Sequence, residues 1–162
     1  YKNQDLESPT ITALFGNASK DSPQASRLLV REAKVESIHY TNMVQTRVSI
    51  DRFTGGALNS ALFNEQPVWG GEVTFHFRVS NPKEYEVGLL LLLLKDLWTG
   101  DLPIGGESSI GRGRLKGSQA KLSYRKQSWT LQQDAPSLGL SPKEQEKLQK
   151  FVDALLIQKE KQ

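Results

Sequence analysis

A run of six consecutive leucines at residues 89–94 constrains the fold more than any other stretch of this sequence. A membrane-spanning helix needs roughly 20 apolar residues, so the run predicts a helix that is buried inside the protein. The residues before it are typical of a helix start, because Asn81 can act as N-cap, Pro82 suits the first position and Glu84 lies three residues after the cap. Gly100 is a natural place for the helix to end. We therefore expect a helix over residues 82–98 that a sheet covers.

Three other stretches predict β-strands. Residues 27–35 have apolar side chains on both faces at first, which predicts a buried strand. Residues 44–51 and 73–80 alternate between apolar and polar side chains, which is typical of strands with one face on a core and one face in solvent. Residues 52–70 interrupt this pattern with glycines and a proline. They predict either a long protruding excursion or an ordinary long connection.

Together these elements predict an α+β fold in a chain of 162 residues. We expect one domain over residues 1–140, with a linker at residues 128–140 that contains a proline and a glycine. Residues 141–162 predict an amphipathic C-terminal helix, because Ser141 can cap it and Glu144 follows three residues later. Its apolar stripe can pack on this domain or on a neighbour.

The stretch at residues 105–125 contains five glycines, five basic residues and one acidic residue, whereas the whole chain has a net charge of only +3. Such uneven charge indicates an anionic partner better than the overall balance does. Gly117 and Ser118 predict a two-residue hairpin turn. That turn would gather five basic side chains on one face, namely Arg112, Arg114, Lys116, Lys121 and Arg125. The preceding glycines could form an anion-binding nest, and a solvated surface hairpin is the plain alternative.

Several classes of chemistry are not supported. Gly106 and Gly111 have the spacing of a P-loop, but Arg112 and Gly113 stand where Lys and then Ser or Thr are needed. A Rossmann fingerprint also fails, because the third glycine is missing and the glycines follow a helix. The absence of cysteines excludes disulfides and thiolate zinc sites and is compatible with a reducing cytosol. With two histidines, a multi-histidine metal site is not expected.

Candidate catalytic residues are few. Asp51 ends a predicted strand, and its carboxylate could assist attack by an RNA 2′-hydroxyl or help to place a divalent metal ion. A salt-bridged or turn-capping aspartate is the alternative. His39 and His76 are candidate general bases because histidine changes protonation near neutrality, and ordinary positions on half-exposed strands are the alternative for both.

The signal for nucleic acid is stronger. Proteins hold single-stranded RNA with sheet surfaces, basic side chains on phosphates and aromatic stacking. Basic side chains lie in the glycine-rich stretch and on the polar faces of the predicted strands, the latter being Arg47, Arg52, His76 and Arg78. The aromatic residues near them are limited to Phe53, Tyr124 and Trp129. This composition favours tracking a backbone over reading bases.

The order of five motifs then becomes informative. The strand SRLLVREAKV precedes the turn IDRFTGGA at residues 50–57, which is followed by ALFNEQPVWGGEVTFHFRV, the leucine-rich helix and IGGESSIGRGRLKG. Over most of residues 13–125 this order resembles the RAMP superfamily of CRISPR effector proteins, especially the backbone subunits of type III complexes. RAMP proteins usually begin with a strand, a glycine-containing loop and a helix, which the polar, turn-rich residues 1–24 do not show. We expect the chain to be the C-terminal portion of a RAMP domain, one piece of a longer or split protein.

The resemblance implies a ferredoxin-like, RNA-recognition-type fold whose subunits stack along a guide RNA. It also implies a thumb-like hairpin at residues 47–68 that interrupts the guide–target duplex, and a glycine-rich loop at residues 105–113 that touches the guide backbone. On this basis the expected RNA-binding residues are Gly105, Gly106, Ser108, Ser109, Gly111, Arg112, Gly113, Arg114, Lys116, Arg47, Arg52 and Thr54. Some family members cut target RNA with a metal-assisted aspartate, for which Asp51 is the candidate.

We therefore expect the chain to bind guide RNA as a subunit or segment of an RNA-guided, type III-like CRISPR effector complex in antiviral defence. Its expected partners are guide RNA, target RNA and other effector subunits in the cytoplasm, with no membrane. Binding requires no cofactor in this hypothesis, and Mg2+ enters only if target RNA is cut. The alternatives are a metal-dependent endoribonuclease that acts through Asp51 and a non-CRISPR binder of an anionic small ligand. Whether the chain is an enzyme stays open.

Overall fold

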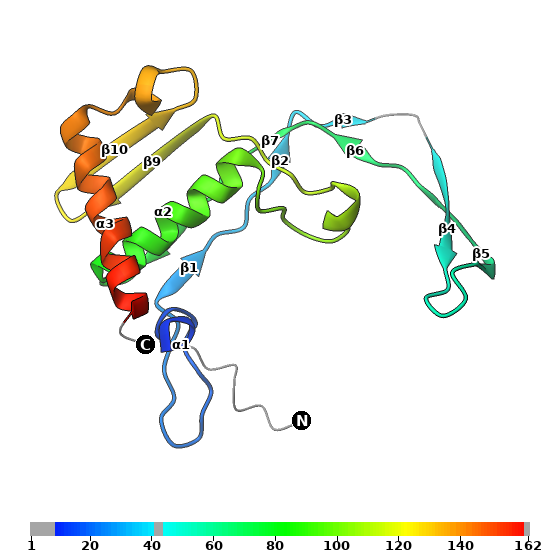
Figure 1. Ribbon diagram of the computed structural model, residues 1–162, viewed down its shortest axis with the longest axis horizontal. Coiled ribbons are helices and arrows are strands. Elements are labelled where there is room, and N and C mark those ends of the chain that lie inside the picture. Colours follow the sequence, from blue (N-terminus) through cyan, green and yellow to red (C-terminus); the bar gives the residue numbers. More distant parts are fainter. Residues whose placement is uncertain (1–8, 41–43, 161–162) are drawn as a thin grey trace. The chain divides into compact units, whose positions relative to one another are not determined.

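The computed structural model describes residues 9–40 and 44–160, and the chain divides into two compact units, Tyr1–Ser80 and Asn81–Gln162 (Figure 1). The chain contains both helices and strands, so the α+β prediction is confirmed. Residues 1–8 of the N-terminal stretch and the last two residues of the predicted C-terminal helix lie outside the described residues. Within the described ranges, no helix has both the length and the apolar character needed to cross a membrane.

The first unit consists of a short helix and a two-stranded antiparallel ribbon. After α1 (Pro9–Phe15), the outgoing strands are β1 (Leu28–Val30), β2 (Val35–Glu36), β3 (His39–Tyr40) and β4 (Gln45–Ile50). The returning strands are β5 (Ala57–Glu65), β6 (Val68–Trp69), β7 (Glu72–Val73) and β8 (Phe77–Val79). They pair in nested order, β4 with β5, β3 with β6, β2 with β7 and β1 with β8. Figure 1 labels the strands of the first three pairs. The ribbon therefore turns back at residues 51–56.

Hydrogen bonds connect α1 to the first strand of the ribbon. The Ser26 hydroxyl donates to the Leu14 carbonyl at 3.1 Å, and the Arg27 backbone N–H donates to the same carbonyl at 2.9 Å. The Arg27 guanidinium donates from Nε to the Ala13 carbonyl at 2.8 Å. Leu14 is only 4% exposed and is the one buried hydrophobic residue among the described residues of this unit. The buried apolar side chain of this unit thus lies where the helix meets the ribbon.

The strands of the ribbon are shorter and more exposed than the sequence predicts. The prediction of a buried strand at residues 27–35 is wrong, because β1 spans only three residues and Leu29 and Val30 are 50% and 52% exposed. The alternating stretch at residues 73–80 is divided between β7 and β8. A two-stranded ribbon offers no second layer to cover its side chains, so apolar residues on it stay in solvent.

The second unit contains two helices and a hairpin. Helix α2 (Glu84–Thr99) is followed by the 3-10 turn η1 (Ser108–Ile110), by strands β9 (Gln119–Tyr124) and β10 (Gln127–Gln132), by the 3-10 turn η2 (Pro136–Gly139) and by α3 (Pro142–Glu160). Its core consists of five buried residues, Val87, Tyr124, Trp129, Leu148 and Phe151. The apolar stripe of α3 therefore packs on this unit.

Close packing brings α2 and α3 together. A Cβ atom at Gly88 of α2 would overlap the backbone carbonyl of Phe151 in α3, so only glycine allows this approach. The Phe151 ring meets Tyr124 and Trp129 edge to face, with ring centroids 5.2 and 6.3 Å apart. Such pairs contribute beyond their buried area. The leucine run of α2 is half-buried, and its most exposed described member is Leu93 at 39%.

The ends of the helices test the predicted signals. Helix α2 begins two residues later than expected, because Asn81 adopts a left-handed backbone with φ of 47° and the N-cap is Lys83. The buried carboxylate of Glu86 accepts the Lys83 N–H at 2.8 Å. The predicted end at Gly100 is confirmed, since that residue is left-handed with φ of 76°. Its N–H donates to the Leu97 carbonyl at 3.3 Å.

The predicted start of α3 is also confirmed. The Ser141 N–H and hydroxyl donate to Glu144 Oε2 at 2.9 and 2.6 Å, and the Glu144 N–H donates to the Ser141 carbonyl at 3.0 Å. The Ser141 hydroxyl and then its N–H lower the pKa of Glu144 from the ordinary value of a glutamate. The helix thus begins where two residues that lie three positions apart form hydrogen bonds with each other's backbone and side-chain groups.

Candidate nucleic-acid interface

The glycine-rich loop in the second unit is a closed turn. The Ile104 N–H donates to the Gly113 carbonyl at 2.9 Å and joins the two ends of the loop. Inside it, Glu107 and Gly111 have left-handed backbones with φ of 60° and 86°, one on each side of the 3-10 turn η1. The N–H groups of Ile110 and Gly111 donate to carbonyls within the loop at 3.1 and 3.0 Å. These two N–H groups of the expected anion-binding nest therefore form hydrogen bonds within the loop itself.

The glycines of this loop fall into two classes. At Gly105, Gly106 and Gly111, a Cβ atom would find nothing within 4 Å, so these positions leave open space beside the backbone. At Gly113, which has a φ of +73°, a Cβ atom would overlap the Ile104 carbonyl oxygen. The first three glycines are available for the close approach of a ligand, whereas Gly113 is needed to close the loop.

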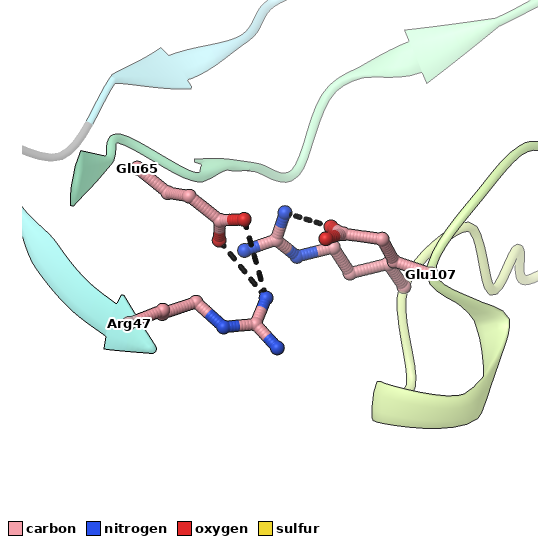
Figure 2. Close-up of polar contacts among 4 residues, drawn as sticks. Arg47, Glu65 and Glu107 are labelled. Carbon is pink, nitrogen blue, oxygen red and sulfur yellow. Dashed lines mark hydrogen bonds and ion pairs between the residues drawn. The ribbon is translucent and has the colours of Figure 1, made fainter. Parts of the chain in front are cut away.

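An acidic residue of the same loop holds Arg112. The guanidinium of Arg112 forms an ion pair with the Glu107 carboxylate, which Figure 2 shows at the labelled Glu107. The two side chains remain 33% and 42% exposed, so solvent reaches the pair. Glu107 orients Arg112 and also offsets its charge, so an RNA phosphate would compete with Glu107 for the guanidinium.

Arg114 and Lys116 occupy different environments. The Arg114 guanidinium donates to the Gly100 carbonyl at 2.6 Å, at the end of α2. A cation at this position satisfies a terminal carbonyl and complements the negative end of the helix dipole. Lys116 is exposed. Arg114 therefore has a structural role that its place in a basic run does not reveal.

The predicted hairpin turn at Gly117 and Ser118 is wrong. The Gly117 N–H donates to the Trp98 carbonyl at 3.0 Å, and a Cβ atom at Gly117 would overlap the Trp98 ring. The glycine is needed because the chain crosses this indole, and residues 112–118 form no strand. The Ser118 carbonyl accepts the Gln133 N–H at 2.9 Å.

The hairpin of this unit turns at Arg125 and Lys126 instead. Tyr124 pairs with Gln127 across the turn, and Arg125 adopts a left-handed backbone with φ of 54°. The predicted basic face therefore does not form, since Lys121 lies opposite Thr130. The Arg125 guanidinium lies over the Tyr124 ring, 5.0 Å from its centroid. The linker predicted at residues 128–140 is also wrong in its first part, because β10 lies there and its Trp129 is 3% exposed.

Arg47 lies in the hairpin of β4 and β5 in the first unit. Its guanidinium forms an ion pair with Glu65 at 3.0 Å, as Figure 2 shows for the labelled pair. The Thr46 hydroxyl and the Asn64 side-chain oxygen are 2.8 Å apart on the neighbouring cross-strand pair. These contacts bind the two strands together through their polar side chains.

The apolar face of this hairpin is its exposed face. Val48 and Leu62 lie directly opposite each other and are 39% and 72% exposed, and Ile50 is 56% exposed. By contrast, Gln45 and Arg47 on the other face of β4 are half-buried. Alternation predicted the two faces correctly, but which face would be covered cannot be derived from alternation alone.

The turn of the ribbon is organised by Asp51. Its N–H donates to the Gly56 carbonyl and its carbonyl accepts the Gly55 N–H, both at 2.8 Å. Its carboxylate accepts the Phe53 N–H at 2.8 Å, and this hydrogen bond lowers the pKa of Asp51 from the ordinary value of an aspartate. Phe53 is 99% exposed, and the Thr54 hydroxyl accepts the Gly56 N–H at 3.3 Å. The result is a structured turn that presents an aromatic ring to solvent.

Among the described residues, Asp51 is not part of a larger group of possible metal ligands. Across residues 9–40 and 44–160, no three His, Asp or Glu side chains are grouped so as to hold a metal ion. The Asp51 carboxylate instead serves the turn. His39 lies in β3 opposite Trp69, whereas His76 lies between β7 and β8, so the two histidines lie in different segments of the ribbon.

Sequence reasoning missed the acidic partners of the two arginines. Glu107 lies in a left-handed conformation that brings it back to Arg112, and no local rule for helices or strands pairs residues five apart in this way. Glu65 reaches Arg47 only because of the register of β4 and β5. That register could have been proposed by centring a hairpin on the glycines of residues 51–56.

Comparison with known proteins gives one family. No curated protein matches the chain in a sequence search. The family model described as the RAMP superfamily matches residues 1–116, which include the ribbon and the glycine-rich loop. The chain therefore belongs to the RAMP superfamily, whose members are CRISPR-associated RNA-binding proteins.

Proposed function

We propose that the chain binds the backbone of a guide RNA as a subunit or segment of a type III-like CRISPR effector complex in antiviral defence. The observation that supports this function best is the glycine-rich loop, where three glycines leave open backbone beside Arg112. Close approach to an unobstructed backbone with an arginine at its edge suits a phosphodiester, which presents charged oxygens but no sequence information. The site residues Ser108, Ser109 and Lys116 belong to the same proposal.

We assign the role of a thumb-like hairpin to β4 and β5. Its turn presents Phe53 to solvent, beside Arg52 and Thr54, and the described residues leave its apolar face exposed. An exposed aromatic on a structured turn is suited to stacking against nucleobases where a duplex is interrupted. In this proposal the domain is ferredoxin-like, acts in the cytoplasm and contacts target RNA and other effector subunits.

Two charge substitutions of opposite sign test the role of the loop. Glu107→Gln removes the carboxylate that offsets Arg112, so the affinity for single-stranded RNA should rise about threefold, whereas Arg112→Gln should lower it about tenfold, as expected for one charge-assisted contact. Fluorescence anisotropy at 50 and 200 mM NaCl measures both, and Arg112→Gln should make the salt slope shallower by about 0.7.

Lys143→Gln is the matched control, because it removes one exposed positive charge at the start of α3. If Lys143→Gln weakens RNA binding as much as Arg112→Gln, or if Glu107→Gln weakens it, the loop is not the RNA site. A wild-type chain that binds inorganic phosphate but no RNA would favour the small-ligand alternative.

The nuclease alternative has a separate test. Asp51→Ala removes the carboxylate that accepts the Phe53 N–H, so we expect a looser turn and unchanged RNA binding by the glycine-rich loop. If the proposed binding function is correct, labelled RNA that is incubated with the wild-type protein and Mg2+ should stay intact. Cleavage that disappears in Asp51→Ala would show that the chain is an endoribonuclease.

A further inference from the structure

A small cavity lies beside the pair of strands β1 and β8, far along the chain from the glycine-rich loop. It has a volume of about 170 Å3 and is lined by Leu29, Arg31, His76, Phe77 and Arg78. Leu29 pairs with Arg78, and Val30 pairs with Phe77. The Arg31 N–H donates to the His76 carbonyl at 3.1 Å, so Arg31 and His76 lie opposite each other directly after the last of these pairs. Because alternate residues of a strand share a face, the side chains of Arg31, His76 and Arg78 lie on the same side of the ribbon.

Within residues 9–40 and 44–160, these three basic side chains have no acidic neighbour that pairs with them. Among the described residues, none of their side chains forms a hydrogen bond or ion pair with the protein, in contrast to Arg47 and Arg112, which each have a glutamate. Like charges opposite or diagonal to one another destabilise a ladder unless an anion lies between them. The cluster therefore has the charge of an anion site and no acidic partner in the part of the chain that the structure describes.

We propose that the cavity between Arg31, His76 and Arg78 binds a phosphate group. Arginine presents a planar fork of N–H donors that matches phosphate oxygens, and two arginines line this cavity. The volume of about 170 Å3 lies below the roughly 300 Å3 at which pockets begin to enclose a drug-sized ligand, so one phosphate fits the space better than a whole nucleotide does. This site rests on the proposed function for the source of the phosphate, which is either an internal phosphodiester of RNA or a terminal phosphate monoester.

The first experiment does not depend on RNA. The chain has two histidines, so NMR signals of the His76 ring can be compared with those of His39 in the same protein, with His39→Gln used for assignment. Inorganic phosphate at constant pH and ionic strength should shift the His76 signals with saturation and leave those of His39 unchanged. Arg31→Gln combined with Arg78→Gln should abolish the shift. If both histidines shift in parallel, or neither shifts, the proposal is overturned.

The second experiment identifies the source. Two single-stranded RNA oligonucleotides of one sequence, with a 5′-phosphate or a 5′-hydroxyl, are measured against the wild type and the Arg31→Gln and Arg78→Gln double variant. The backbone hydrogen bonds of both positions survive these substitutions, and circular dichroism checks the fold. Equal losses of about tenfold for both oligonucleotides assign an internal phosphodiester, and a loss confined to the 5′-phosphorylated RNA assigns a terminal phosphate.

The control variant removes the same number of positive charges at other positions. Lys20→Gln combined with Lys143→Gln also deletes two exposed positive charges, and it should change RNA affinity by less than twofold. Equal losses in the control and in the arginine variant would overturn the site. If the wild type binds no RNA at all, the proposed function fails, and the phosphate titration still decides whether this cavity is an anion site.

Discussion

Two alanine substitutions separate the closure of the glycine-rich loop from its proposed contact with RNA. Gly105 and Gly113 both have a positive φ, +85° and +73°, so a left-handed alanine costs about 1–2 kcal/mol at either position. At Gly105 the new methyl group meets nothing within 4 Å. At Gly113 it would overlap the carbonyl oxygen of Ile104, whose N–H closes the loop. The two variants therefore differ in one steric clash, which only Gly113→Ala introduces.

The size of that difference follows from the structure. Accommodating an extra methyl group at a closely packed position lowers the free energy of unfolding by about 1–3 kcal/mol. Losing the Ile104–Gly113 hydrogen bond of 2.9 Å adds about 1 kcal/mol. Gly113→Ala should then lower the free energy of unfolding by about 3–6 kcal/mol, against about 1–2 kcal/mol for Gly105→Ala. Urea denaturation followed by tryptophan fluorescence measures both, because Trp129 is 3% exposed and reports on the core of this unit.

The RNA affinities of the same variants complete the test. Gly105→Ala should keep most of the stability but weaken RNA binding several-fold, because its methyl group occupies the open space beside the backbone. Equal destabilisation by the two substitutions would refute the reasoning that Gly113 closes the loop. Unchanged RNA binding by Gly105→Ala would refute close approach of RNA to this glycine.

Three further predictions concern other parts of the chain. Gly88→Ala should lower the free energy of unfolding by about 1–3 kcal/mol or more in urea denaturation, because its methyl group would overlap the Phe151 carbonyl; wild-type stability would contradict this. Glu144→Gln should lower the melting temperature at pH 7, and its difference from the wild type should shrink as the pH falls. Ser141 lowers the folded-state pKa of Glu144, so the stabilisation by the charged carboxylate is present above the ordinary carboxyl range and is lost as the pH falls through the lowered pKa. A difference that persists in acid would show that the cap does not depend on the charge. Phe53→Ala should leave the melting temperature unchanged, since the ring is 99% exposed, yet weaken RNA binding about tenfold if it stacks on a base; equal affinity in anisotropy would exclude stacking.

Local signals in the sequence were good guides to the ends of helices. Ser141 and Glu144 satisfy each other's backbone and side-chain groups within three residues, and Gly100 accepts a left-handed backbone without the steric cost of a Cβ atom. The start of α2 was misplaced because Asn81 and the proline after it form a typical helix start, whereas the buried Glu86 selects Lys83 as the N-cap by accepting its N–H. Here a side chain whose burial depends on the fold decided between two local options.

The candidate site could be predicted only in part. Its glycines and arginines are visible in the sequence, and the family resemblance placed them in an RNA-binding protein, which the family match confirms. The pairing of Arg112 with Glu107 and the capping of α2 by Arg114 could not be derived, because both contacts depend on how the chain turns between residues 100 and 114. Charge runs in a sequence do not reveal which cations are already engaged.

The sequence by itself determined the elements whose causes lie within a few residues: the start of α3, the end of α2 and the turn of the ribbon at residues 51–56. Only the tertiary structure decided what Gly117 does. A glycine suits a hairpin turn and close approach equally well, because both require the absence of a Cβ atom. The Trp98 ring, which lies 19 positions earlier in the sequence, occupies the space that this atom would need. The hairpin therefore turns at Arg125, and the basic face predicted from Gly117 does not form.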